Sequence, residues 1–192
     1  LKISQYVLNS KIADYVLTGG IVGQLFLVAK GYDLGKPNME FLQKQGVLSL
    51  TQGIKGLMDA YPEAVKVPSD LAVEYEGRRR EISVKNLPTE HQISDIGIET
   101  IREYSLIIGR AESIVASGPM GVFEKEEFFK GTKMILEAIA SSKVFSLVGG
   151  GHTVAAVEEL GLADKMGYVS TAGGALIEFL MGEKLPGVAA LE

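Results

Sequence analysis

The chain has 192 residues and a formal net charge of −5, and 46% of its residues are hydrophobic. These values are typical of a globular protein with one good-sized core, and the acidic balance argues against general nucleic-acid binding. The sequence contains no cysteine, which excludes disulfides, cysteine-based zinc sites and thiol catalysis. No apolar run approaches the roughly 20 residues that cross a bilayer, so no transmembrane helix is predicted.

Apolar and amphipathic segments alternate along the first third of the chain. Helices are predicted for residues 1–11, 21–30 and 38–58, and a strand for residues 15–18. Gly31 follows the second helix as a C′ residue, and Pro37 is expected to open the third. Because Leu1 would lie inside a helix, we expect the chain to be a fragment.

The section from Pro62 to Pro88 breaks this alternation and is more polar. A short strand is predicted at residues 65–67, followed by two strands, 70–75 and 79–84, that are joined through Glu76-Gly77-Arg78. A glycine-bearing connection between two such runs indicates a hairpin. We therefore expect a small antiparallel appendage here, with the Arg78–Arg80 run most simply explained as solvated charge.

The remainder returns to strands followed by helices. Helices are expected within residues 97–109, 126–141, 154–160 and 175–181, and strands at 113–116, 144–148 and 168–171. Strands that alternate with helices predict a parallel sheet covered on both faces. The expected fold is α/β, a three-layer Rossmann-like sandwich with a mainly parallel central sheet and a small antiparallel hairpin appendage, in one domain over residues 1–192.

Glycines follow several predicted strands at the point where each turns into a helix. These loops are Thr18-Gly19-Gly20, Ser117-Gly118-Pro119, Val148-Gly149-Gly150 and Ser170-Thr171-Ala172-Gly173. The carboxyl ends of parallel strands meet at one edge of a sheet, where ligands bind. Free backbone N–H groups and the positive end of a helix dipole can hold an anion there. The sequence therefore predicts phosphate handling at this edge.

Neither of the two commonest phosphate loops is present. A dinucleotide fingerprint would need glycine or alanine where the chain has Val154, and the acidic residue expected about twenty positions later is missing. The sequence contains no Walker A loop. The glycines at 149–151 alone fit a tight strand-to-helix turn equally well.

The segment from Ser117 to Glu124 is more specific, because Pro119 fixes its own φ angle while Gly118 and Gly121 allow unusual turns. Glu124 has two interpretations. Its carboxylate complements a helix N-terminus, which is the simpler one, or it accepts hydrogen bonds from a pair of sugar hydroxyls. His152 likewise fits a solvated or capping residue, or a phosphate or metal contact.

Taken together, these motifs resemble the C-terminal half of the phosphoglycerate kinase family, in order and spacing and over nearly the whole chain. The segments that carry the resemblance are 18–20, 29–32, 117–124, 128–133, 149–157, 169–175 and 182–188. His152 and the short hairpin region look like the archaeal branch.

The resemblance implies a Rossmann-like domain that binds MgADP or MgATP as substrate, with Mg²⁺ held mainly through the nucleotide and no metal ligand in this chain. It implies that the intact cytoplasmic enzyme transfers the acyl phosphate of 1,3-bisphosphoglycerate to ADP in glycolysis, giving 3-phosphoglycerate and ATP. No nucleic-acid or membrane partner is implied. By similarity, Glu124 takes the ribose hydroxyls, Pro119 and Val122 line the nucleoside pocket, Gly150, Gly151, His152 and Thr153 cover the phosphates, and the N–H groups of Gly150 and Gly173 face the transferring phosphoryl group.

The chain departs from the family pattern at three positions. His152 stands where the family commonly has a magnesium-contacting aspartate, Ser117 where it often has asparagine, and Ala172 where it has glycine. The basic substrate-binding domain and a Gly-Gly-Ala-Lys segment would precede Leu1. We therefore expect this chain alone to bind nucleotide weakly and to be nearly inactive.

Two other functional classes stay open at this point. A stand-alone nucleotide-binding module without kinase activity would share the glycine loops. A dinucleotide-dependent oxidoreductase would also use a glycine junction, but Val154 and the missing acidic residue disfavour it.

Overall fold

The structure is a computed structural model that describes residues 1–191. The helices are α1 (Lys2–Asn9), α2 (Gly20–Ala29), α3 (Lys36–Lys44), α4 (Thr51–Ala60), α5 (Ile98–Ile108), α6 (Lys130–Ser141), α7 (Gly151–Glu159), α8 (Gly174–Leu180) and α9 (Pro186–Ala189). The strands are β1 (Val16–Leu17), β2 (Val65–Lys66), β3 (Asp70–Tyr75), β4 (Arg78–Ser83), β5 (Ile93–Ile96), β6 (Ser113–Ser117), β7 (Phe145–Gly149) and β8 (Tyr168–Ser170). None of the described helices is long and apolar enough to cross a bilayer.

The strands form three sheets. β6, β7 and β8 make a parallel sheet in which Ser117, Gly149 and Ser170 stand side by side at the carboxyl ends. β1 pairs in parallel with β2, and β3 pairs antiparallel with both β4 and β5. The α/β class, the parallel sheet and the small antiparallel appendage are thus confirmed, with the parallel strands divided between two sheets.

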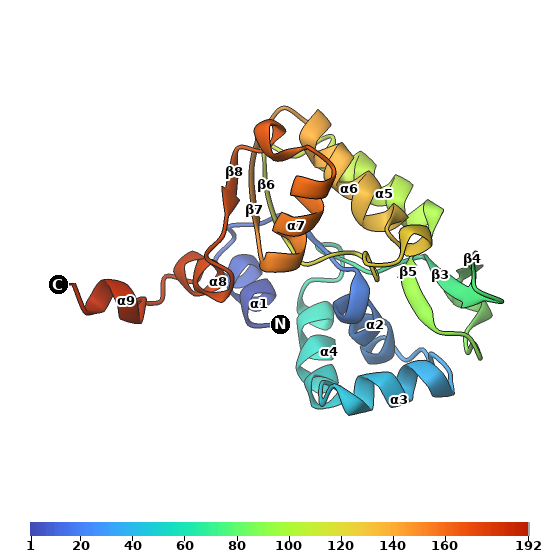
Figure 1. The fold of residues 1–192 in the computed structure, drawn as a ribbon. Coiled ribbons are helices and arrows are strands. Elements are labelled where there is room, and N and C mark those ends of the chain that lie inside the picture. The colour runs from blue at the N-terminus through green and yellow to red at the C-terminus, as the bar shows by residue number, and fades with distance from the viewer. Residues whose placement is uncertain (192) are drawn as a thin grey trace.

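Figure 1 shows how the helices lie relative to the sheet of β6, β7 and β8. Helices α5, α6 and α7 cover one face of this sheet, while α2, α3 and α4 form a separate layer beyond its carboxyl edge. The opposite face of the sheet carries exposed apolar side chains, with Val115, Phe145 and Tyr168 each more than half exposed. Helices α1 and α8 lie near the carboxyl end of this sheet (Figure 1).

Two clusters of buried apolar side chains stabilise these layers. One joins α1 to α4 with β2 and β3, and includes Phe26, Leu34 and Leu42. The other joins α5, α6 and α7 to β7, and includes Tyr104 and Val148. In α5 and α6 the buried apolar residues are spaced three and four apart, as in Ile101, Tyr104 and Ile108, which is the pattern of an amphipathic helix.

The single helix expected over residues 38–58 is wrong. Helix α3 ends at Lys44, Gly46 adopts a φ of +68°, and a short 3₁₀ turn (Leu48–Leu50) leads into α4. A glycine in the left-handed region ends a helix by turning the chain away from its axis. The apolar spacing continues across the break because both helices pack on the same buried cluster.

The hairpin is confirmed and its turn is tighter than expected. Glu76 and Gly77 both have positive φ, which is the two-residue turn that matches strand twist. Strand β5 was not predicted, because Ser94 and Asp95 interrupt its apolar pattern. Both residues are nevertheless buried.

Candidate functional site

The glycine-bearing loops at the strand ends contact one another in series. The Gly20 N–H donates to the Met120 carbonyl at 2.8 Å, which joins the loop after β1 to the loop after β6. The Gly118 N–H donates to Thr153 Oγ1 at 2.7 Å, which joins the β6 loop to the start of α7. These contacts confirm that the loops after β1, β6 and β7 lie next to one another along one edge.

The first glycine junction connects β7 to α7 and is open to solvent. Gly150 has a φ of +89°, a conformation that L side chains rarely adopt, and it is the N-cap residue of α7. A Cβ built on Gly151 would meet no atom within 4 Å, and His152 is exposed. No side chain caps the helix, so the first N–H groups of α7 remain available to an anion.

Thr153 differs from its neighbours because it is buried, with 1% of its surface exposed. Its hydroxyl oxygen accepts the Gly118 N–H, and within residues 1–191 no acceptor takes its own O–H, which can therefore donate to a ligand. The residue thereby fixes the spacing between the β6 loop and the start of α7.

The second glycine junction connects β8 to α8 beside the first. Gly173 has a φ of +55°, and a Cβ there would meet no atom within 4 Å. The Ser170 hydroxyl accepts the Ala172 N–H at 3.3 Å. Leu176 packs so closely on Gly149 that a Cβ there would lie 2.2 Å from its Cδ2 atom. The two junctions therefore form one continuous surface.

The segment after Ser117 lies against this surface. Val122 is exposed and Pro119 is half-buried. The rings of Phe123 and His152 lie with their centroids 5.6 Å apart, which places the segment carrying Glu124 beside the first turn of α7. The structure thus brings together Pro119, Val122, Gly150, Gly151, His152 and Thr153, as the sequence suggested, with Gly173 on the adjoining junction.

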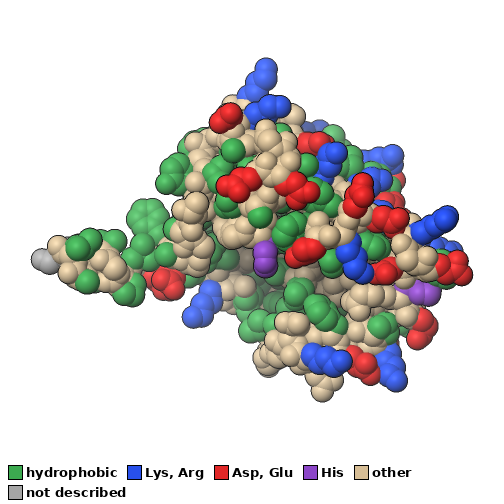
Figure 2. Space-filling view, in the orientation of Figure 1, with side chains coloured by type: hydrophobic (Ala, Val, Ile, Leu, Met, Phe, Trp, Pro, Cys, Tyr) green, Lys and Arg blue, Asp and Glu red, His purple; other side chains and the backbone are tan. Residues whose placement is uncertain are grey.

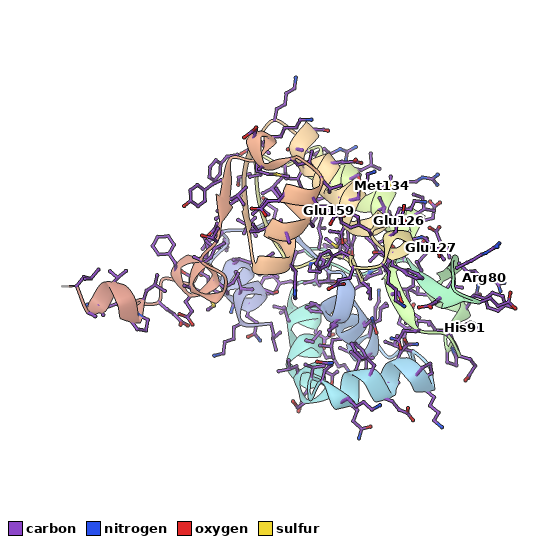
Figure 3. The ribbon with its side chains drawn as sticks, viewed as in Figure 1. Arg80, His91, Glu126, Glu127, Met134 and Glu159 are labelled. Atoms are coloured by element: carbon purple, nitrogen blue, oxygen red, sulfur yellow. The ribbon has the colours of Figure 1, made fainter. Side chains whose placement is uncertain are left out.

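Glu124 itself lines a groove between this segment and the end of α7. The groove is lined by Phe123, Glu124, Glu126, Phe129, Lys130, Lys133, Glu159 and Leu160. Figure 3 labels Glu126 and Glu159, which belong to its two sides. Within residues 1–191, no ion pair or hydrogen bond occupies the Glu124 carboxylate, so its oxygens can accept from a ligand.

Acidic and basic side chains alternate around this groove and the neighbouring hairpin (Figure 2). The mixture gives no single-sign field, which fits a site that holds phosphate by directed N–H groups rather than by bulk charge. Among the described residues, no group of three or more acidic or histidine side chains is placed to bind a metal.

Tyr104 in α5 is hydrogen-bonded to the carboxyl ends of β1 and β2. Its hydroxyl lies 2.8 Å from the Thr18 carbonyl and 3.2 Å from that of Lys66, at the carboxyl ends of β1 and β2. Burial raises the pKa of Tyr104. The end of β1, and with it the Gly19-Gly20 loop, is therefore attached to α5.

Three residues that reinforce the site were missed from the sequence. Asp95 and Thr132 are buried and bond to the backbone N–H groups of Gly131 and Met120, while the partly buried Arg79 bonds to Asp95 and to Glu127. The solvated interpretation of the arginine run is wrong for Arg79, whose side chain is only 12% exposed. A buried charge of this kind needs a partner from elsewhere in the fold, and no local pattern reveals that partner.

The fold and its strand ends define an α/β protein with a glycine-lined edge at the carboxyl ends of its parallel strands. A family model described as phosphoglycerate kinase matches residues 2–183. The chain belongs to the phosphoglycerate kinase family.

Individual relatives agree with this assignment. The phosphoglycerate kinase of Pyrococcus abyssi is 43% identical over 196 aligned residues, covering 100% of this chain and 48% of that protein. That of Methanothermobacter thermautotrophicus is 43% identical, covering 100% of this chain and 46% of its own length. The chain spans about half the length of the curated relatives it matches. The resemblance to the archaeal branch is confirmed.

Solved structures show the same likeness in three dimensions. The crystal structure of phosphoglycerate kinase from Pyrococcus horikoshii OT3 matches with a TM-score of 0.92 and 42% identity, over 99% of this chain and 48% of that one. The phosphoglycerate kinase of Coxiella burnetii matches with a TM-score of 0.84 and 31% identity, over 98% of this chain and 48% of that one.

Proposed function

We propose that residues 1–192 are the C-terminal nucleotide-binding domain of a phosphoglycerate kinase and bind MgADP or MgATP along the glycine-lined edge. The uncapped start of α7 carries this proposal. Its first N–H groups face open space at Gly151 and are flanked by the segment from Pro119 to Glu124. Family membership supports the same ligand.

Each candidate residue has a role that its surroundings permit. The exposed Glu124 carboxylate accepts the ribose hydroxyls, and Pro119 with Val122 lines the nucleoside pocket. Gly150, Gly151, His152 and Thr153 cover the nucleotide phosphates, to which backbone N–H groups and the Thr153 hydroxyl donate. The open N–H groups of Gly150 and Gly173 face the phosphoryl group in transit.

The intact enzyme would transfer the acyl phosphate of 1,3-bisphosphoglycerate to ADP in the cytoplasm. The bond between phosphorus and the carboxyl oxygen breaks, a bond from phosphorus to the terminal ADP oxygen forms, and 3-phosphoglycerate leaves as a carboxylate. Such a reaction needs positioning and charge stabilisation more than covalent catalysis. Gly150 and Gly173 would stabilise the developing charge by directed N–H groups.

The residues present fit a metal ion held by the nucleotide. Bound in this way, Mg²⁺ neutralises phosphate charge during transfer. His152, at the position of the family's aspartate, is exposed in the first turn of α7. Neither nucleic acid nor membrane is part of the proposal.

The two three-carbon substrates would bind an N-terminal domain that completes the enzyme. Closure of two domains excludes water from the reacting groups. We therefore expect this chain alone to form little or no ATP from 1,3-bisphosphoglycerate. Appreciable ATP formation by the purified chain would contradict the division of labour between the two halves.

The binding role is tested by titrating the purified chain with MgADP while following heat release or melting. A ligand at 100 times its Kd stabilises the folded state by about 2.7 kcal/mol. An absence of both heat and stabilisation at millimolar MgADP would refute the proposal. NAD(H) stabilising more than MgADP would favour an oxidoreductase. The stand-alone module is not favoured, since the family match spans residues 2–183.

The ribose role is tested by Glu124→Ala, with Glu126→Ala as the matched control because Glu126 lines the same groove. Loss of a charged hydrogen-bond acceptor costs about 1.5–3 kcal/mol, which is a tenfold to hundredfold weaker affinity for ADP. Affinity for 2′,3′-dideoxy-ADP and for tripolyphosphate should change little. Equal losses for all three ligands would contradict contact between Glu124 and the ribose.

A further inference from the structure

Asp95 is a fully buried carboxylate enclosed by two glycines from different parts of the chain. A Cβ on Gly121 would lie 2.5 Å from Asp95 Oδ1, and one on Gly131 would lie 2.1 Å from the same atom. Contacts this short exclude any side chain at either position. Asp95 therefore contacts both ends of the segment 121–131, which contains Glu124.

Hydrogen bonds also link the Asp95 carboxylate to the backbone around it. The Gly131 N–H donates to Asp95 Oδ2 at 2.7 Å, and the Ile96 N–H donates to Oδ1 at 2.9 Å. Burial raises the pKa of Asp95 above its ordinary value, and hydrogen bonds from Arg79 and Gly131 oppose that shift. An ionised carboxylate at this depth requires such partners.

Arg79 on β4 completes the set of partners. Its guanidinium donates to Asp95 Oδ2 at 2.7 Å, to the Ile96 carbonyl at 2.7 Å and to Glu81 Oε1 at 3.2 Å. Its backbone N–H donates to Glu127 Oε2 at 2.9 Å. Figure 3 labels Glu127 beside the hairpin. The hairpin is thus joined to segment 121–131 by side-chain and backbone contacts.

The segment from Pro119 to Glu124 is also bonded to β5, the strand that carries Asp95. The Val122 N–H donates to the Ser94 carbonyl at 2.7 Å, one residue before Asp95. The Met120 N–H donates to Thr132 Oγ1 at 3.0 Å, one residue after Gly131. Any shift of Asp95 or Gly131 therefore moves the backbone on which Pro119, Val122 and Glu124 are carried.

The phosphate half of the site stands apart from these partners. The start of α7 meets the nucleoside segment through Gly118 and Thr153 and through the Phe123–His152 ring contact. Within residues 1–191, none of the hydrogen bonds of Arg79 or Asp95 reaches α7. The two halves of the site can therefore be perturbed separately.

We propose that the Arg79–Asp95 pair is a positioning device that holds the Pro119–Glu124 segment in its nucleoside-binding conformation, so that the antiparallel hairpin serves the nucleotide site. This inference rests on the proposed function. Arg79 and Asp95 act through the backbone of residues 120–131 and do not touch the ligand. A segment that is correctly placed for one tenth of the time binds its ligand about tenfold more weakly.

The test uses Arg79→Lys and Asp95→Asn in the whole 192-residue chain. Lysine keeps the charge but loses the fork that bonds to two oxygens at once, and asparagine keeps the size but loses the charge. Arg102→Lys is the matched control, since Arg102 forms an exposed pair with Glu99 within α5. Affinities for MgADP and for tripolyphosphate are measured by calorimetry, and exchange of the Val122 amide by NMR.

Each outcome decides the proposal. We expect both variants to bind MgADP about tenfold more weakly and tripolyphosphate within about twofold of the parent, with a faster Val122 exchange rate. Equal losses for both ligands, or unchanged MgADP affinity in a folded variant, would overturn it while leaving the proposed function intact. A parent chain that binds no MgADP would overturn both. If Asp95→Asn does not fold, Arg79→Lys alone decides.

Discussion

The hydroxyl of Tyr104 offers a direct measure of how firmly the glycine-lined edge is attached to the helices behind it. The residue is 1% exposed, and its oxygen contacts the carbonyls of Thr18 and Lys66. The Lys66 carbonyl also accepts from the Thr18 N–H and the Thr18 hydroxyl. Removing the Tyr104 hydroxyl therefore harms Thr18 most, because Lys66 keeps two donors.

Tyr104→Phe keeps the ring and deletes only this oxygen. A buried acceptor that loses its donor costs about 1–3 kcal/mol, and the remaining donors on Lys66 place the expected loss at about 1–2 kcal/mol. For a chain of this size, such a loss lowers the melting temperature by about 2–8 °C. Urea unfolding at neutral pH measures the free energy of unfolding directly.

The control is Tyr61→Phe, since the Tyr61 hydroxyl donates to Asn9 Oδ1 at 2.8 Å on the exposed surface. Water replaces that partner, so the free energy of unfolding should fall by less than about 0.5 kcal/mol. Equal losses for the two variants would refute the reasoning, because burial would then have no influence on the worth of the bond.

Alkaline pH provides an independent check on Tyr104. Because burial raises its pKa in the folded state, its contribution to stability is complete below the unfolded value of about 10 and is lost as pH rises above it. The difference between parent and Tyr104→Phe should shrink above pH ~10 by up to about 1.4 kcal/mol per pH unit. A difference that stays constant to pH 11 would contradict the raised pKa.

Two glycine substitutions separate stability from binding. Gly46→Ala should lower the free energy of unfolding by about 1–2 kcal/mol, because its φ is +68° and no neighbouring atom adds a clash; an unchanged urea midpoint would contradict this. Gly151→Ala should leave stability unchanged or raise it by up to about 1 kcal/mol, because Gly151 lies in a helix with open space around it. The added methyl group should weaken MgADP binding measured by calorimetry. An unchanged Kd would contradict the proposed contact between Gly151 and the nucleotide phosphates.

The sequence by itself determined the parts of this protein that depend on local spacing. Apolar runs followed by glycine predicted the carboxyl ends of β1, β6, β7 and β8 to within one residue, and the turn at Glu76-Gly77 was predicted from its glycine. These features need only neighbouring residues, since glycine permits backbone conformations that other residues avoid. The family followed from the order of the same motifs.

Tertiary structure decided the features in which distant residues meet. The break at Gly46 was hidden because apolar spacing continues through both α3 and α4, and β5 was hidden because Asp95 reads as a surface residue. Only the fold brings Arg79 and Gly131 to that carboxylate, and only the fold joins the glycine loops through Gly118 and Thr153. A buried charge is stable only with partners at hydrogen-bond distance, and sequence separation conceals which partners those are.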